Sequence, residues 1–311
     1  MPGMTSEMNQ AVVQTELDDV FMQEWNFRQQ AGHVDAMSSE VFIQDTTTSA
    51  AVIEEIFKGT GLWGKREESE DVQSSDSRIQ NKITFNVVNL ADSIDIPKNF
   101  FDDNMHSSYE KMVKNFGEMA RVTRDENAFS LFRNAFTTTL TADGLTLVSD
   151  AHITISGATV DNKMTEALTE ESLNTAIIKL GEQKDQAGVV RGSQPKTLLV
   201  PLALFKYAME ITGSELRQGT ADNDMNVYST SYGINVATTN RLGAVIEGGS
   251  DTAWFLLGSN HSATRWVRQG IVTTLVDWRL QRNNSYIYKG EFREMVGVLD
   301  YVGVVGSTGT A

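Results

Sequence analysis

The stretch "DDNMHSSYEKMVKNFGEMARVTRDENAFSLFRNAF", residues 102–136, carries the strongest helical pattern in the chain. Hydrophobic residues recur along it every three or four positions, the spacing that places side chains on one face of an α-helix. They are Met105, Tyr109, Met112, Phe116, Met119, Phe129, Phe132 and Phe136. Asp102 or Asp103 can cap the N-terminus. We therefore predict one long helix over residues 103–137. About 30 helical residues span about 45 Å, so this helix needs a broad surface to lie across.

Strand patterns surround this helix. Residues 83–96 alternate between hydrophobic and polar, with a change of phase near Val87 that indicates a bulge or bend. Further strands are predicted in "GINVATTNRLG" (233–243), "TAWFLLGS" (252–259), "TRWVRQGIVTTLVDWRL" (264–280) and "SYIYKGEFREMVGVLDYVGVVG" (285–306). A second helix is predicted in residues 169–188, capped by Thr169 with Ser172, and a strand running into a third helix in residues 196–212. There is no regular βαβ alternation, so the fold class is α+β.

Length and composition exclude several classes of protein. A chain of 311 residues can form one or two domains with a buried core. It has no cysteine, which excludes disulfides, thiol catalysis and iron–sulfur sites. The first residues resemble no secretory signal, and no hydrophobic run is long enough to cross a bilayer. We expect a soluble protein, made in the cytoplasm.

Charge is distributed unevenly along the chain. The net charge of −15 disfavours tight binding to nucleic acid, which needs clustered lysine and arginine. Residues 1–57 carry ten acids and one base, a balance of −9, whereas residues 262–293 carry six bases and two acids, a balance of +4. These two segments can complement each other within a subunit or between subunits. Short helical turns are predicted in the acidic segment at residues 17–30 and 51–58.

The stretch "KGTGLWGKREESED", residues 58–71, imitates a nucleotide-binding loop. A phosphate-binding loop follows a strand and precedes a helix, so that the helix N-terminus faces the anion. Here the preceding residues are predicted to be helical, acids follow, and Arg66 stands where a hydroxyl residue would be needed for magnesium. We interpret the stretch as a flexible projecting loop.

The other candidate sites lack an essential part of their patterns. "DNDMN" (222–226) begins like a calcium loop, but Val227 stands where that loop needs glycine and Gly233 where it needs glutamate. Ser149, Asp150 and His152 are too close in sequence to form a serine–histidine–carboxylate catalytic triad easily. The remaining histidines are scattered without metal-ligand spacing. We therefore expect no catalytic residue, no cofactor site and no metal site.

Five segments together resemble the major capsid proteins of tailed bacteriophages, and within them the Mu-like major head subunits. They are "DGLTLVSDAH" (143–152), "PKTLLVPLALFKYAMEI" (195–211), "LRQGTADNDMNVY" (216–228), "TAWFLLG" (252–258) and "YKGEFREMVGVLDYVGVVGSTG" (288–309). The resemblance runs from about residue 40 to the end, and residues 216–228 are its most specific part.

The resemblance implies the capsid fold shared with herpesvirus capsid floors and encapsulin shells. Its parts would be an N-terminal arm (1–57), an extended hairpin loop (58–92), a peripheral domain (93–195 and 282–311) with a spine helix (103–137), and an axial domain (196–281). Glycines 59, 61 and 64 would then let the chain leave the body as a projecting hairpin. The subunit-interface candidates are Trp63, Lys65, Arg66, Arg265, Arg268 and Arg279.

The implied function is a major head protein that assembles into pentamers and hexamers of an icosahedral shell around double-stranded phage DNA. An encapsulin-type nanocompartment subunit is the alternative, and an enzyme on an unrelated α+β fold is a third possibility, which the missing catalytic set disfavours. Expected partners are further copies of the chain, a separate scaffold protein, a portal and a decoration protein, with weak, non-specific DNA contacts. Lys65 is available for a cross-link between subunits, but a single lysine does not establish one.

Overall fold

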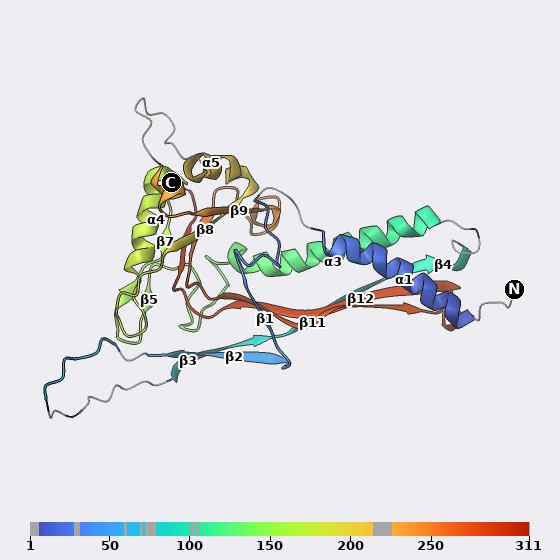
Figure 1. Cartoon of the computed structure of the whole chain (residues 1–311), viewed down its shortest axis with the longest axis horizontal. Coiled ribbons are helices and arrows are strands. Elements are labelled where there is room, and N and C mark those ends of the chain that lie inside the picture. Colours follow the sequence, from blue (N-terminus) through green and yellow to red (C-terminus); the bar gives the residue numbers. More distant parts are fainter. Residues whose placement is uncertain are drawn as a thin grey trace.

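The computed structural model describes residues 6–27, 32–58, 61–68, 71, 79–99, 103, 106–213 and 226–310. These residues form an elongated molecule with a head at one end, a long body, and a hairpin that projects from the body (Figure 1).

The body is built on α3 (His106–Arg133), the helix that the sequence predicted over residues 103–137. It lies along a four-stranded sheet of order β1–β11–β12–β4, so the expected broad surface is confirmed (Figure 1). The strands are β1 (Ile43–Thr46), β4 (Val88–Pro97), β11 (Ala263–Val276) and β12 (Ser285–Val298). β12 is antiparallel to both of its neighbours, and η2 (Trp278–Leu280) lies between β11 and β12, whereas β1 is parallel to β11.

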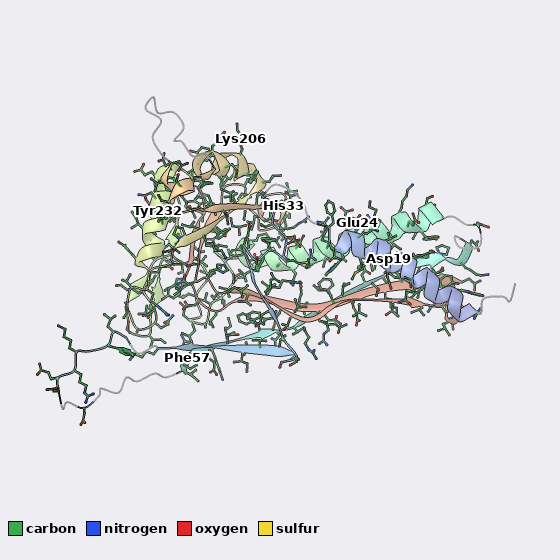
Figure 2. All side chains as sticks on the ribbon, in the orientation of Figure 1. Asp19, Glu24, His33, Phe57, Lys206 and Tyr232 are labelled. Carbon is green, nitrogen blue, oxygen red and sulfur yellow. The ribbon has the colours of Figure 1, made fainter. Side chains whose placement is uncertain are left out.

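A second helix of the body, α1 (Ser6–Trp25), corrects the prediction of short turns in this region. Leu17, Phe21 and Trp25 are spaced by four residues and are buried in one cluster with aromatic residues of α3 and β12. Asp19 and Glu24 lie on the same helix (Figure 2), and Glu24 pairs with Lys114 of α3 at 3.4 Å. The part of the acidic arm that forms α1 therefore packs on its own subunit.

The head contains a five-stranded sheet of order β7–β13–β10–β8–β9. Its strands are β7 (Lys163–Met164), β8 (Pro195–Pro201), β9 (Asn235–Thr239), β10 (Trp254–Gly258) and β13 (Val304–Ser307). The other elements are β5 (His152–Ile153), β6 (Thr159–Val160), α4 (Glu170–Glu182), α5 (Leu202–Thr212), α6 (Val227–Thr230) and η1 (Asn240–Leu242). The predicted cap of α4 is confirmed, since Thr169 and Ser172 form a reciprocal capping box. One hydrophobic cluster joins α4 to the sheet, and a second joins the sheet to the C-terminal half of α3.

The projecting hairpin is formed by β2 (Ala51–Phe57) and β3 (Ile79–Asn86), which pair antiparallel. Residues 51–58 were predicted to be helical, and this was wrong. Their hydrophobic residues fit a helix locally, but backbone pairing with β3 decides the outcome. Phe57 stands at the end of β2, where the chain leaves the strand (Figure 2).

The two sheets cut across the predicted domain boundaries. β11 lies in the predicted axial range but belongs to the body sheet, whereas α4 and β13 lie in the predicted peripheral range and pack in the head. The hairpin begins at Ala51 rather than at residue 58, and β4, which begins at Val88, is part of the body. Residues 214–225 lie outside the described residues. They include most of the stretch 222–226, which begins like a calcium loop, and most of residues 216–228, the segment with the most specific resemblance to capsid proteins.

Candidate subunit-interface site

The hairpin carries two large hydrophobic side chains in solvent. Leu62 is 82% exposed and Trp63 is 92% exposed. Lys65 and Arg66 follow them and are exposed as well. The described residues 65–67 after Gly64 form no helix, so this part has no helix N-terminus that could face a phosphate. Gly61 has a φ of +69°, a conformation that glycine adopts without strain.

The root of the hairpin is fixed to the body sheet by an aromatic contact. Phe85 of β3 stacks on Trp266 of β11 with ring centroids 5.0 Å apart. Gly297 of β12 lies under the same ring, and a Cβ at this position would stand 2.2 Å from Phe85 Cε1. Only glycine leaves room for the ring, so this contact sets where the hairpin leaves the body. From the sequence, Phe85 is recognisable only as a strand residue, because its partners Trp266 and Gly297 lie far away along the chain.

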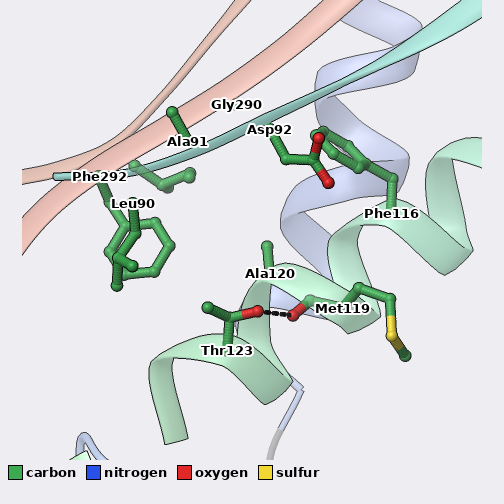
Figure 3. Close-up of a pocket in the computed structure, with 10 residues that line it drawn as sticks. Leu90, Ala91, Asp92, Phe116, Met119, Ala120, Thr123, Gly290 and Phe292 are labelled. Carbon is green, nitrogen blue, oxygen red and sulfur yellow. Dashed lines mark hydrogen bonds between the residues drawn. The ribbon is translucent and has the colours of Figure 1, made fainter. Parts of the chain in front are cut away.

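A hydrophobic groove lies between α3 and the body sheet, beside β4 (Figure 3). Its cavity volume is about 250 Å³. The hydrophobic lining includes Leu90, Phe116, Met119, Ala120, Ile271 and Phe292. Asp92 and Thr123 add polar groups, and Met119 remains 46% exposed. The groove was not predicted, although Phe116 and Met119 belong to the stripe that predicted α3.

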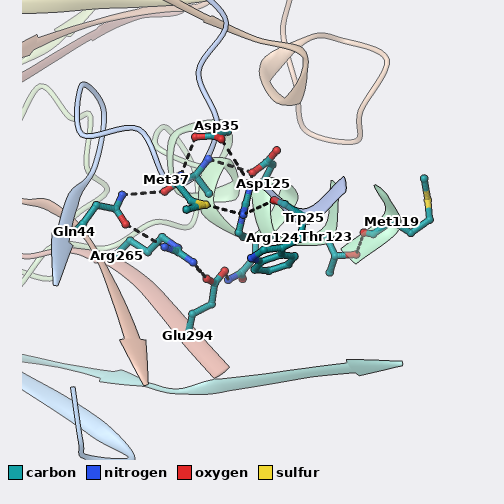
Figure 4. A network of polar contacts seen from close by, with 12 residues as sticks. Trp25, Asp35, Met37, Gln44, Met119, Thr123, Arg124, Asp125, Arg265 and Glu294 are labelled. Atoms are coloured by element: carbon teal, nitrogen blue, oxygen red, sulfur yellow. Dashed lines mark hydrogen bonds and ion pairs between the residues drawn. The ribbon is translucent and has the colours of Figure 1, made fainter. Parts of the chain in front are cut away.

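Arg265, predicted to lie at a subunit interface, is buried inside the subunit instead (Figure 4). Its Nε donates to Glu294 Oε2 at 2.8 Å, its Nη2 contacts the same oxygen, and its Nη1 donates to Gln44 Oε1 at 3.0 Å. Glu294 is fully buried, and Asn127 Nδ2 donates to its other oxygen at 3.2 Å. A guanidinium held this way has no exposed face for a neighbouring subunit, and we remove Arg265 from the interface candidates.

The other two arginine candidates lie closer to solvent. Arg268 is half-buried on β11, and Arg279 is exposed in η2. Arg279 lies 3.8 Å from Asp277 Oδ2 and over the Trp278 ring. The basic segment 262–293 and the acidic arm meet within one subunit, because β1 pairs with β11.

A second buried ionic group ties the N-terminal segment to α3 (Figure 4). The Arg124 side chain is fully buried, with its guanidinium 4.6 Å from the Trp25 ring centroid. Its Nε donates to Asp125 Oδ1 at 3.3 Å, and its Nη2 lies 3.7 Å from Asp35 Oδ2. Burial lowers the pKa of Arg124 and raises that of Asp125, against the mutual attraction of their charges. Such a group orders the segment around residues 35–37 on the helix.

His152 pairs with an aspartate, but not with Asp150. Its Nδ1 lies 2.6 Å from Asp143 Oδ2, and its ring stacks on Tyr301. Burial pushes the pKa of Asp143 upward, but hydrogen bonds from His152, Thr141 and the Leu145 N–H outweigh this and lower it. The Ser149 hydroxyl accepts from the Ala151 N–H at 3.3 Å. His152 is fully buried between these partners, an arrangement that serves the packing of the loop.

Within the described ranges, no cluster of three histidine, aspartate or glutamate side chains is arranged to hold a metal ion. No helix in that part of the chain is both long and hydrophobic enough to span a membrane.

Comparison with known proteins identifies the family. No curated protein matches the sequence significantly. The fold is similar to that of the capsid of the cyanophage P-SCSP1u, at 14% identity and a TM-score of 0.56, over 92% of this chain and 93% of that one. The fold is also similar to that of the capsid of Myoviridae phage XM1, at 11% identity and a TM-score of 0.54, over 92% of this chain and 95% of that one. A virus-like particle from Pyrococcus furiosus has a similar fold, at 10% identity and a TM-score of 0.54, over 94% of this chain and 98% of that one. A profile of the family described as "Phage capsid protein" matches residues 101–307, about two thirds of the sequence. The chain therefore belongs to the phage capsid protein family.

Proposed function

We propose that the chain is the major head subunit of a tailed phage and assembles into the pentamers and hexamers of an icosahedral shell around double-stranded DNA. The observation that carries the proposal beyond the family is the hairpin that presents Leu62 and Trp63 to solvent. Two adjacent large hydrophobic side chains on a projecting element are unfavourable in water and gain stability when another molecule covers them. Tryptophan is also enriched among the residues that dominate binding at interfaces.

The remaining partners follow from the same proposal. A scaffold protein, a portal and a decoration protein would meet the shell during assembly in the host cytoplasm. The packaged DNA would be contacted weakly and non-specifically, since a net charge of −15 per subunit disfavours close phosphate binding. The subunit would act as a structural protein without a cofactor.

A nanocompartment subunit is the second candidate. The likeness to the virus-like particle from Pyrococcus furiosus supports it, at a TM-score close to those of the phage capsids. The two candidates differ in what the shell encloses, which is DNA in one case and protein in the other.

The test is electron microscopy of the purified protein, expressed alone and together with its neighbouring genes. We expect closed shells of uniform diameter. Nuclease-protected DNA inside shells from infected cells supports the phage function, whereas an enzyme identified inside them by mass spectrometry supports the nanocompartment.

A hairpin deletion is the matched control for this test. Removal of residues 62–80 should leave a folded subunit by circular dichroism, because the three hydrophobic clusters lie outside this range. The same deletion should abolish shells. A protein that forms no closed particle under any of these conditions would contradict the proposed function.

A further inference from the structure

We infer that three aspartates, Asp45, Asp92 and Asp161, keep the open edges of the two sheets from pairing with a strand of a second copy of the chain. Each carboxylate accepts a hydrogen bond from a backbone N–H that points away from its sheet. The inference concerns the single subunit and does not depend on the proposed function.

The outermost strands of a sheet invite association. They are β1 and β4 in the body sheet, and β7 and β9 in the head sheet. Such a strand carries backbone groups on one side that a strand of another copy can satisfy. β4 offers the longest edge, since its ten residues pair with β12 in continuous register. Ile43 on β1 and Val88 on β4 are 48% and 44% exposed, and hydrophobic side chains on an open edge increase the risk.

On β4 the outward N–H group at the middle of the strand is occupied. Directly after β4, the Lys98 N–H donates to the Asn284 carbonyl, directly before β12, at 3.2 Å. The direction of the backbone groups alternates along a strand, so even-numbered residues of β4 face β12 and the Ser93 N–H points away from it. Asp92 Oδ1 accepts this N–H at 2.8 Å. Asp92 lies on the part of β4 that borders the groove (Figure 3).

The other edge of the body sheet has the same arrangement. The Thr47 N–H donates to the Val267 carbonyl of β11 at 3.1 Å, so the Thr46 N–H points away from β11. Asp45 Oδ1 accepts the Thr46 N–H at 2.7 Å. Both open edges of this sheet thus carry an aspartate directly before the residue whose N–H it occupies.

The head sheet repeats the arrangement on β7. The carbonyls of Asn162 and Met164 accept from N–H groups of β13 and of the residue after it, at 3.0 and 3.2 Å. Lys163 lies between them, so its N–H points away from β13. Asp161 Oδ1 accepts this N–H at 2.9 Å.

The edge at β9 is closed by the chain itself. Val34 N–H donates to the Thr238 carbonyl, and Thr238 N–H donates to the Gly32 carbonyl, both at 2.8 Å. A backbone segment covers one edge, and a carboxylate occupies an outward N–H on each of the other three.

A carboxylate at such an N–H opposes pairing for a physical reason. An incoming strand presents a carbonyl oxygen to the N–H, but the carboxylate is already there and is itself an acceptor. Pairing would break a charge-assisted hydrogen bond and bring two acceptors together. The three aspartates are exposed, so their carboxylates stay hydrated in the single subunit. They therefore act on association more than on the fold.

Asp92→Val in the full chain tests the inference on the longest edge. The substitution frees the Ser93 N–H, and the purified variant should form at least about fivefold more irregular aggregate than the parent at equal concentration. Sedimentation velocity and thioflavin T fluorescence measure this aggregate, and electron microscopy distinguishes it from closed shells. Circular dichroism and urea unfolding should be close to those of the parent.

Asp95→Val is the matched control. It makes the same change of charge and side chain on the same exposed strand. Asp95 Oδ2 accepts from Asn283 Nδ2 at 3.1 Å, and the Ile96 N–H that follows faces β12. This variant should aggregate no more than the parent. Equal aggregation of the two variants would contradict the inference.

Ser93→Pro in the Asp92→Val background adds a rescue. Proline has no N–H, and it is tolerated on an edge strand where the N–H points outward. The double variant should return to the parental level of aggregate. Aggregate that persists would show that the added valine, and not the free N–H, is responsible, and would overturn the inference.

β1 provides an independent site should Asp92→Val fail to fold. Asp45→Val should aggregate and Thr46→Pro should reverse this, because all four residues of β1 are exposed and tolerate substitution. Parental behaviour of a folded Asp45→Val variant would contradict the inference for this edge. The shell function is unaffected by either result, since it is tested by the closed particles of the parent.

Discussion

Gly117 of α3 lies directly against the backbone of Phe21 in α1. A Cβ at this position would stand 2.9 Å from the Phe21 carbonyl oxygen, a distance that forces one helix to move. The two helices of the body are therefore held at a separation that only glycine permits.

Gly117→Ala should destabilise the subunit despite the better helix propensity of alanine. The propensity gain is about 1 kcal/mol, whereas overpacking costs about 1–3 kcal/mol and here meets backbone, which cannot rotate away. The free energy of unfolding from urea titration measures the balance. Gly181→Ala in α4 is the control, because nothing lies within 4 Å of its Cβ position, and it should be neutral or slightly stabilising. Equal effects of the two substitutions would contradict the contact.

Gly297→Val should release the root of the hairpin. The added side chain occupies the space of the Phe85 ring, so Phe85 loses its stacking on Trp266 and the hairpin loses its fixed direction. We expect a loss of about 1–3 kcal/mol in unfolding free energy and a larger loss of shell yield. Gly270→Ala, in β11 of the same sheet with nothing within 4 Å, should leave both unchanged. Shells at the parental yield from Gly297→Val would mean that the root contact does not direct assembly.

Arg265→Met should destabilise the subunit by about 3–5 kcal/mol, because it leaves the fully buried Glu294 without its counter-charge. Adding Glu294→Met should recover much of this loss, since a hydrophobic pair can replace a buried ion pair. A double-mutant cycle measured by urea unfolding gives the coupling between the two. Arg279→Met, at an exposed site, should change stability by less than about 0.5 kcal/mol. If Arg265→Met is equally harmless, the side chain does not serve the fold as the structure indicates.

His261 should make the subunit sensitive to acid. Burial, with a smaller effect of the Lys196 charge, lowers the pKa of His261 to about 4. The folded-state pKa lies below the unfolded value of about 6.5, so unfolding binds a proton and stability falls as pH drops from 6.5 toward 4. The total loss is roughly 2–4 kcal/mol, and stability no longer depends on His261 below that range.

Comparison of the parent with His261→Asn isolates this contribution. Unfolding free energies at pH 7 and pH 4.5 should differ less in the variant than in the parent, by about 2 kcal/mol or more. An unchanged difference would mean that His261 is protonated in the folded subunit, contrary to its burial.

The sequence predicted the elements whose pattern is local. The stripe through Tyr109 and Phe116 identified α3, and the strand patterns in residues 83–96 and 285–306 identified strands of the hairpin, body and head. α1 was underestimated because its recognisable stripe covers only Leu17, Phe21 and Trp25, and the surface that stabilises it is formed by distant residues. β2 was assigned to a helix because "AVIEEIF" fits both periods, and only its pairing with β3 decides between them.

The same limit applies to the candidate site, because its contacts join residues that are distant in the sequence. Glycines and charges predicted an exposed loop around Trp63, and Trp63 is exposed, whereas its place at a subunit interface stays a prediction. Arg265 was misplaced because a positive segment gives no indication of which arginine meets a buried glutamate. The groove joins residues of β4, α3, β11 and β12, so no single stretch of sequence contains it.

The stacking of Phe85 on Trp266 over Gly297 also has a consequence for the order of synthesis. A ribosome adds about 5–20 residues per second, so roughly 10–40 s pass between the emergence of Phe85 and that of Gly297. During this interval the hairpin already carries Trp63 but has no complete root, and for most of it β1 has no β11 to pair with. An unfinished chain therefore lacks the contact that sets where the hairpin leaves the body.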